Sequence, residues 1–227
     1  MPASLWTIFT VSFLMALSGA LMPGPLFTYT IARTMQTRSR GFLVGGQVVA
    51  GHAVLEMVIL AALVLGIAEF LKAPVAIKII GVLGALILGY MGINLILEAV
   101  RRGSANRKED GAEQRESPGS AATRLSPYLA GIIISASNPY WWVWWITAGS
   151  ATLMGFGVGL SSWQGLLAFF LGHEAADLGW YLTVSTLTHF GRRRITGGFY
   201  RGILAACGLF IAGFGAYLGI SAFFRGA

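Results

Sequence analysis

Long apolar stretches alternate with short polar ones along the whole chain. Each stretch reaches the roughly 20 residues that an α-helix needs to cross the hydrocarbon core of a bilayer. The stretches cover approximately residues 5–31, 42–70, 74–97, 125–149, 165–187 and 199–224. Because they use most of the chain, no separate soluble domain is expected. The pattern therefore predicts an all-α polytopic membrane protein with six transmembrane helices.

Proline interrupts two of these stretches. The first contains Pro23-Gly24-Pro25, and the fourth contains Asn138-Pro139. Because proline cannot donate to the helical ladder and clashes with the preceding turn, we expect helices 1 and 4 to be broken there into half-helices. Asn is a preferred N-cap and Pro is favoured at the first helical position, so each restarted half-helix would present unpaired N–H groups near the bilayer centre. Such a helix start suits a carboxylate, and a simple kink is the alternative.

The second half of the sequence repeats features of the first. G-H-A-V-L-E at 51–56 returns as G-H-E-A-A-D at 172–177. Residues 81–93 also align with 208–220. Taken by itself, that second match is explained by chance similarity between Gly-rich helices. With three helices in each copy, the second copy must lie upside down, an arrangement that recurs in secondary transporters. We therefore expect two inverted three-helix repeats, and the chain then divides into residues 1–97, a polar cytoplasmic loop at 98–124, and residues 125–227.

Three acidic residues, Glu56, Glu174 and Asp177, lie well inside apolar stretches. An ionisable group at such a depth points by default toward a cavity, a partner or a proton path. His52 shares a helix face with Glu56, four residues on, and His173 with Asp177 in the same way. Facing each other across the repeat axis, the two faces would form one polar midplane site, and a histidine beside a carboxylate suits proton uptake and release. The alternative is a structural role, in which each His–carboxylate pair locks the helices together. This alternative applies more to the two histidines than to the acidic residues.

Four tryptophans crowd behind Asn138-Pro139, at 141, 142, 144 and 145. Aromatic residues often mark a membrane interface, so part of this cluster is expected to anchor and pack. Trp141 and Trp145 are candidates for an aromatic wall that contacts a substrate ammonium. The H-E-A-A-D segment is similar to the H-E-x-x-H of zinc peptidases, but Asp177 replaces the second His and no third ligand motif is apparent. An intramembrane enzyme is therefore the least favoured class.

The net charge of +7 comes from short loops that lack the aromatic motifs of nucleic-acid binding. Most Lys and Arg lie in or beside the first, third and fifth loops, at 33–40, 101–124 and 192–201. By the positive-inside rule these loops are cytoplasmic, and both termini are outside. The first stretch has no Lys or Arg before it, so we expect it to be retained rather than cleaved as a signal peptide. The single Cys207 provides neither an intramolecular disulfide nor a thiolate metal cluster, and no cofactor or resident metal is expected.

Several short motifs together resemble the LysE/RhtB-type amino-acid exporters. They are P-G-P in the first stretch, G-x-x-x-G (Gly41, Gly45) at the start of the second, N-P in the fourth and D-x-x-W (Asp177, Trp180) in the fifth. The resemblance covers essentially the whole chain. It implies a small, multi-pass protein of the prokaryotic inner membrane that exports amino acids or related metabolites using the proton gradient.

The resemblance also assigns residues by position. Those that match the family's helix breaks are Pro23, Gly24, Pro25, Asn138 and Pro139. Asp177 matches its fifth-span acid. The sequence departs from the family in the second span, where His52 and Glu56 occur together. This departure leaves the substrate open.

The leading hypothesis is a secondary active transporter that exports small zwitterions by proton antiport. The helix breaks would hold the substrate carboxylate, and Glu56 and Asp177 would hold its ammonium group. His52, His173 or Glu174 would carry the coupling protons. The wider superfamily also includes exporters of divalent metals, for which the same five side chains would form a nitrogen–oxygen site. The expected partners are the substrate, protons and the lipid bilayer, and a homodimer stays open.

Overall fold

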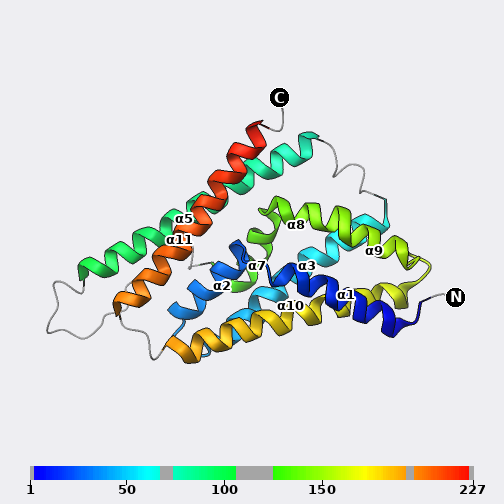
Figure 1. The fold of residues 1–227 in the computed structure, drawn as a ribbon, viewed down its shortest axis with the longest axis horizontal. Coiled ribbons are helices and arrows are strands. Elements are labelled where there is room, and N and C mark those ends of the chain that lie inside the picture. The colour runs from blue at the N-terminus through cyan, green and yellow to red at the C-terminus, as the bar shows by residue number, and fades with distance from the viewer. Residues whose placement is uncertain (1–2, 67–73, 106–124, 193–196, 225–227) are drawn as a thin grey trace.

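The computed structural model describes residues 3–66, 74–105, 125–192 and 197–224. Every element within these ranges is a helix, as the sequence predicted (Figure 1). The elements are α1 (Leu5–Ala20), α2 (Pro25–Gln36), η1 (Gly41–Leu43), α3 (Val44–Val64), α5 (Pro74–Ala105), α7 (Pro127–Ala136), α8 (Pro139–Trp144), η2 (Trp145–Gly149), α9 (Ser150–Gly155), α10 (Trp163–Gly191) and α11 (Gly197–Phe224).

Among the described residues, three helical segments are long and apolar enough to cross a membrane by themselves. They are Gly41–Val64, Gly81–Arg101 and Gly198–Ser221. The pair α1 and α2 makes a fourth if it counts as one span, although its two parts are bent by 73°. Large apolar side chains such as Leu86 (66% exposed) and Leu209 (63% exposed) remain on the outer surface, where lipid would cover them. By length and composition, the described part of the chain therefore has three candidate membrane spans, or up to four, as expected of a membrane protein.

Both expected helix breaks are present. α1 ends at Ala20 and α2 begins at Pro25, while α7 ends at Ala136 and α8 begins at Pro139. At the second break, the Trp142 indole Nε1 donates to the carbonyl oxygen of Ala136 at 2.8 Å and so satisfies one acceptor that the end of α7 leaves unpaired. The fourth stretch then continues through the π-helical turn η2 into α9, a turn that the sequence pattern did not predict.

The third helix extends further than the hydrophobic pattern predicted. The polar loop was expected to begin at residue 98, but α5 continues to Ala105. Glu98, assigned to that loop from the sequence, is only 6% exposed and accepts a hydrogen bond from Gln36 Nε2 of α2 at 3.4 Å. Residues 106–124 lie outside the described ranges.

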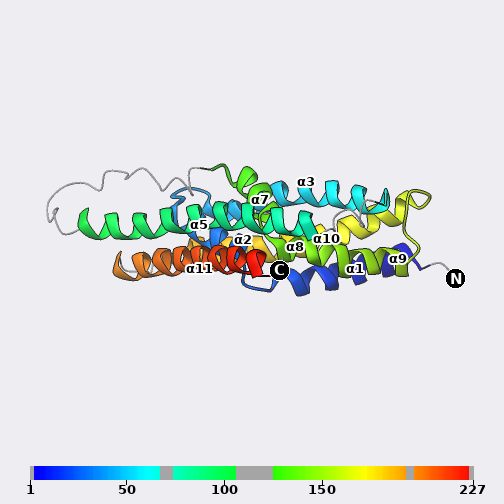
Figure 2. The same ribbon diagram turned by 90° about the horizontal axis from the view of Figure 1, so that it is seen from above.

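Helix pairs from different parts of the chain pack closely. α5 and α11 lie side by side and form the most extensive contact, while α1 packs along α10 and α3 along α7 (Figures 1 and 2). Glycines permit these approaches, since a Cβ at Gly51 would overlap the backbone of Tyr128 and one at Gly172 would overlap that of Phe9. α5 and α11 likewise meet at Gly92 against Ala212 and at Gly219 against Ala85.

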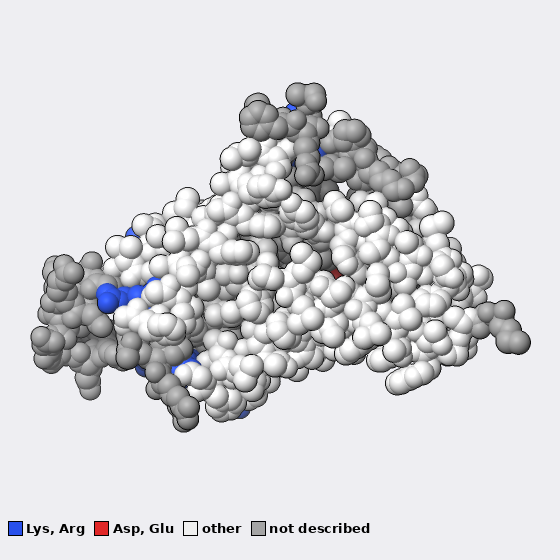
Figure 3. Space-filling view, viewed as in Figure 1, with Lys and Arg blue, Asp and Glu red and all other residues white. Residues whose placement is uncertain are grey.

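Basic side chains gather at one end of the molecule. In Figure 3 blue atoms appear at the left end, where α2, α5 and α10 end and α11 begins. There the Arg192 guanidinium, just beyond α10, donates to the carbonyl oxygens of Thr34, Thr37 and Arg38. A cation at the carboxyl end of α2 also complements the helix dipole. Arg192 therefore fastens the end of α2 to the end of α10.

Candidate functional site

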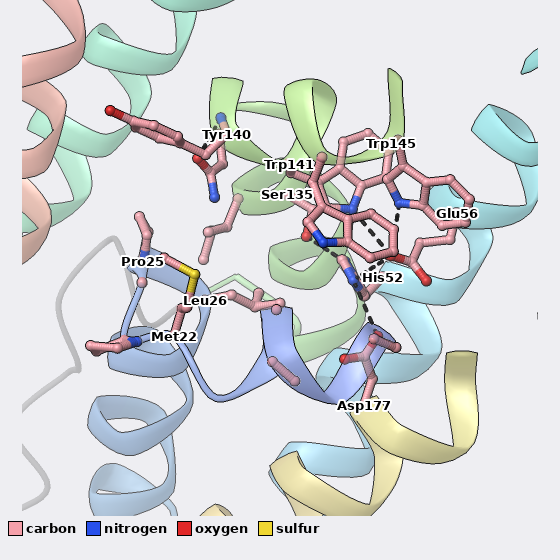
Figure 4. A pocket seen from close by; sticks show the side chains of 18 of the residues that line it. Met22, Pro25, Leu26, His52, Glu56, Ser135, Tyr140, Trp141, Trp145 and Asp177 are labelled. Carbon is pink, nitrogen blue, oxygen red and sulfur yellow. Dashed lines mark hydrogen bonds and ion pairs between the residues drawn. The ribbon is translucent and has the colours of Figure 1, made fainter. Parts of the chain in front are cut away.

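One cavity of about 510 Å³ lies where the two broken stretches meet the middle of α3 and α10 (Figure 4). It is lined by Ala16, Gly19, Ala20, Met22, Pro23, Gly24, Pro25, Leu26, His52, Glu56, Ile134, Ser135, Asn138, Tyr140, Trp141, Trp144, Trp145, His173, Asp177, Tyr181, Phe214 and Tyr217. In the space-filling view a small red patch is visible in a recess near the middle of the molecule (Figure 3).

Two histidines and two carboxylates form a buried cluster at this cavity. His52 Nε2 lies 2.9 Å from Glu56 Oε1 and 3.7 Å from Asp177 Oδ2. His173 Nε2 lies 3.3 Å from Glu56 Oε1 and 3.6 Å from Asp177 Oδ2. All four residues are at most 6% exposed. Each histidine therefore faces both carboxylates, one supplied by its own helix and one by the other helix.

Two indoles hold Glu56 in place. Trp141 Nε1 and Trp145 Nε1 each donate to Glu56 Oε1 at 3.2 Å (Figure 4). Trp145 is completely buried, and a Cβ at Gly149 would approach its ring to 2.8 Å, so the absence of a side chain there leaves room for the indole. Because Trp141 and Trp145 are four residues apart, both reach the same oxygen from one side of the helix.

Three buried polar atoms of the cluster have no hydrogen-bond partner among the described residues. They are Glu56 Oε2, Asp177 Oδ2 and His173 Nδ1. His52 Nδ1, by contrast, lies 2.6 Å from the hydroxyl of Ser135 in α7. Buried polar atoms usually have partners, so these three atoms have hydrogen-bonding capacity that the described residues do not satisfy.

The two helix breaks present different backbone groups to the cavity. At the start of α8, Asn138 Oδ1 accepts from the Tyr140 N–H at 3.1 Å, so this end is capped by its own side chain. At the start of α2 the N-cap is Gly24, and no side chain caps the first turn. Pro25 has no N–H, but Leu26 and Phe27 have N–H groups that precede the first helical hydrogen bond. The uncapped positive end of α2 is therefore the one that an anion could use.

The rest of the lining is mostly apolar or aromatic and carries no cationic side chain in the part of the chain that the structure describes. Tyr140 and Tyr217 stack at a ring distance of 6.5 Å with their hydroxyls 2.9 Å apart, and Phe214 packs against Tyr140. Trp144 contacts the ring of His173. The cavity thus offers an acidic region, an uncapped helix start and aromatic walls.

Most of the residues singled out from the sequence line this one cavity. They are Pro23, Gly24, Pro25, His52, Glu56, Asn138, Trp141, Trp145, His173 and Asp177. Pro139 and Glu174 are not among the lining residues, although both oxygens of Glu174 are buried without a hydrogen-bond partner in the described ranges. Trp141 and Trp145, which the sequence offered as candidates for an aromatic wall, donate to Glu56 through their indoles.

Sequence reasoning missed Ser135, Tyr140, Phe214 and Tyr217. No local signal distinguishes Ser135 from Ser137, which bonds the carbonyl of Ile133 in its own helix. The aromatic residues of α11 reach the cavity only through the packing between helices.

The cluster also has a donor set that a metal ion could use. One nitrogen of His52 and one carboxylate oxygen each from Glu56 and Asp177 lie within 4.8 Å of one another. Nitrogen and oxygen ligands together suit divalent ions such as zinc or manganese.

Residues 17–222 match the family model described as LysE type translocator. Comparison with curated proteins and with solved structures gives no match. The family match covers both helix breaks and every residue of the cluster.

Proposed function

Because the chain belongs to the LysE type translocator family, it is a membrane transporter, and we propose that it exports amino acids or similar zwitterions in exchange for protons. The observation that carries this proposal is the pairing, in one cavity, of buried carboxylates with an uncapped helix start. A zwitterion has one group for each of these features. The family match supports transport, and the cavity supports this class of substrate.

The acidic region suits an ammonium group. Glu56 Oε2 and Asp177 Oδ2 are buried acceptors without hydrogen-bond partners among the described residues. An ammonium group has N–H donors and a positive charge, which would satisfy both oxygens and compensate their buried charge. The aromatic rings of Trp141 and Trp145 add faces that attract a cation.

The start of α2 suits the carboxylate. Its N–H groups and helix dipole attract an anion without a charged side chain. The aromatic lining that includes Tyr140 and Phe214 offers apolar surface to a substrate side chain. In this arrangement Pro23, Gly24 and Pro25 shape the backbone that receives the carboxylate, and Asn138 with Pro139 orders the opposite break.

Proton coupling follows from competition for the same carboxylates. His52 and His173 both face Glu56 and Asp177, so a protonated histidine and a substrate ammonium would compensate the same negative charge. Mutually exclusive binding of proton and substrate is what exchange requires. Glu174, whose carboxylate oxygens are buried and which follows His173 on α10, would take up or release a further proton.

Reciprocal contacts support two inverted repeats with six spans. Gly51 approaches the backbone of Tyr128 as Gly172 approaches that of Phe9. The contacts between α5 and α11 are reciprocal in the same way, because Gly92 meets Ala212 and its aligned residue Gly219 meets Ala85. A pseudo-two-fold axis relates such contacts, as in other transporters with inverted repeats. The basic end near Arg192 would face the cytoplasm of a prokaryotic inner membrane, with both termini outside.

The test is transport in liposomes. Purified protein is reconstituted, a pH gradient is imposed, and the flux of each labelled amino acid is measured with and without the gradient. We expect saturable flux of at least one amino acid that collapses when an ionophore removes the gradient. If no amino acid in a broad panel moves, the proposal fails.

Export of a divalent metal is the second candidate, favoured by the donor set of His52, Glu56 and Asp177. Parallel liposomes that contain a metal-sensitive dye separate the two. Gradient-dependent entry of zinc or manganese, without flux of any amino acid, would replace the first proposal by this one.

A further inference from the structure

Three aromatic residues from two helices that are distant in the sequence form one side of the cavity. Tyr140 lies in the first turn of α8, and Phe214 and Tyr217 lie three residues apart on α11. The centre of the Tyr140 ring is 5.9 Å from that of Phe214 and 6.5 Å from that of Tyr217. All three residues line the cavity, and the two tyrosines are 47% and 46% exposed. These residues, called the α8–α11 wall below, therefore keep ring surface that the protein leaves free.

One face of α8 leads from the cluster of histidines and carboxylates to this wall. The ring of Trp144 lies 5.1 Å from that of His173, measured between ring centres, and Tyr140 precedes Trp144 by four residues. Residues four apart share a helix face, and one helical turn rises about 5.4 Å. Figure 4 shows Tyr140 at the left of the cavity, and Glu56 and Asp177 at its right. The wall therefore stands about one helical turn along α8 from the indole that touches the cluster.

The α8–α11 wall carries no charge. Its polar side-chain atoms are two hydroxyls, and that of Tyr140 donates to that of Tyr217 at 2.9 Å. Among the described lining residues, the side chains that can be charged near neutral pH all belong to the cluster. A charged group beside the wall would lose its hydration without gaining a counter-charge, and a cation–π contact offsets only part of that cost. The wall therefore suits an apolar group.

The sequence repeat provides a matched tyrosine outside the cavity. The alignment of residues 81–93 with 208–220 pairs Tyr90 of α5 with Tyr217 of α11. Tyr217 lines the cavity, whereas Tyr90 is 60% exposed and is not among the described residues that line it. The two positions have the same side chain, and both are well exposed. A ring at the cavity can therefore be tested against an equivalent ring elsewhere.

The cavity of about 510 Å³ has room for more than the two ends of a zwitterion, since pockets of roughly 300–1,000 Å³ hold ligands of drug size. We propose that the α8–α11 wall binds the side chain of the transported amino acid and selects substrates whose side chain is large and apolar, either aromatic or branched aliphatic. This inference rests on the proposed function, which places the ammonium at the cluster and the carboxylate at the start of α2. A small side chain leaves the rings uncovered, and a charged one brings an unpaired charge to them.

The first test compares side chains in the liposome assay. Labelled phenylalanine, leucine, alanine, lysine and glutamate are supplied one at a time, and the transport efficiency (Vmax/KM) is measured for each. We expect phenylalanine and leucine to exceed alanine by about tenfold or more, because covering a side chain of that size contributes at least that factor. Lysine and glutamate should do no better than alanine. Equal efficiencies for phenylalanine and alanine, or a preference for lysine, would overturn the inference and leave the proposed function in place.

The second test removes one ring of the wall. We expect Tyr217→Ala to lower the transport efficiency for phenylalanine about tenfold and that for alanine by less than about twofold. Tyr217→Phe, which keeps the ring without the hydroxyl, should retain the preference for phenylalanine, and Tyr90→Ala should change neither efficiency. Two substrates compared in one variant separate the loss of the side-chain site from a loss of folded protein. Equal losses for both substrates in Tyr217→Ala, or a lost preference in Tyr217→Phe, would contradict the assignment.

A third measurement does not depend on transport. Equilibrium dialysis of the purified protein in detergent against labelled phenylalanine or alanine should show about tenfold tighter binding of phenylalanine, and Tyr217→Ala should remove the difference. If phenylalanine binds in this way but no amino acid moves in liposomes, the proposed function fails and the side-chain site stands. If amino acids move but the two bind equally, the site is wrongly assigned and the proposed function stands. Absence of binding for both would also overturn the assignment.

Discussion

The indole of Trp145 donates a hydrogen bond to Glu56 across the interface between η2 and α3. Nε1 lies 3.2 Å from Oε1, and neither side chain is more than 1% exposed. The broken fourth apolar stretch thus positions the Glu56 carboxylate of the second stretch. The broken helix and the acidic cluster therefore depend on each other.

Replacement of Trp145 by Phe should destabilise the protein and impair transport. The change removes one N–H donor from a buried carboxylate, and we expect a loss of roughly 2 kcal/mol in unfolding free energy. Denaturant titration in detergent measures it. Trp163→Phe is the control, since Trp163 is 65% exposed. Equal effects of the two substitutions would show that the hydrogen bond to Glu56 contributes nothing.

Glu56 and Asp177 should act as one unit in transport. Glu56→Gln and Asp177→Asn preserve shape while removing charge, so we expect transport to fall with little loss of folded protein. Because both acids contact the same two histidines, the double variant should transport about as poorly as the worse single variant. Initial rates of flux in liposomes measure this. Defects that multiply, with normal expression of all three proteins, would contradict a shared site.

Loss of folded protein in the single variants would have a different meaning. The carboxylates would then be structural partners of His52 and His173, and neutralising one would leave a buried histidine with a poorer partner.

The glycines that precede the two histidines should not tolerate a methyl group. Gly51→Ala and Gly172→Ala would place a Cβ against the backbone of Tyr128 or Phe9, and we expect each to cost roughly 1–3 kcal/mol by overpacking. Gly179→Ala is the control on α10, because a Cβ there meets nothing within 4 Å. Thermal unfolding measures the stability of the three variants. A loss of stability in Gly179→Ala as large as that in Gly172→Ala would refute the explanation.

Arg192 should fasten α2 to α10 through its guanidinium rather than its charge alone. Lysine at this position keeps the charge but cannot donate to three carbonyl oxygens in a fixed fork, so Arg192→Lys should lower stability by roughly 1 kcal/mol. The same exchange at exposed Arg101 is the control. Hydrogen exchange at the end of α2 should rise only in the first variant, and unchanged exchange there would count against the anchor.

The orientation can be measured by cysteine labelling after replacement of Cys207. We expect a Cys introduced at Ser161 to react in intact cells with an impermeant reagent, and one at Ser104 to be protected, because the positive-inside rule places the basic stretch 101–124 on the cytoplasmic side. Permeabilised cells provide the positive control for Ser104. The opposite pattern would reverse the topology.

Some features of this site follow from sequence periodicity. The four-residue spacing predicts that His52 shares a face with Glu56 and His173 with Asp177, and the structure brings these two faces together. Proline chemistry predicts both breaks, since a residue without an N–H cannot continue the ladder at Pro25 or Pro139.

Other features depend on how helices are rotated against one another. Periodicity does not show that the indole of Trp145 points at Glu56, nor that Ser135 rather than Ser137 faces α3. Glu98 looked like part of a polar loop because charged residues follow it, yet it lies in the last turns of α5 and packs against α2. Such contacts are decided by tertiary packing.

The uncapped start of α2 differs from the acidic cluster in one further respect. It attracts an anion through backbone N–H groups, which neither gain nor lose protons across the physiological range, and it has no titratable side chain. The other region of the cavity contains four groups that can change charge. A protein that works between two compartments of unequal acidity would thus hold one end of its cargo with constant strength, and only the other end would sense which compartment it faces.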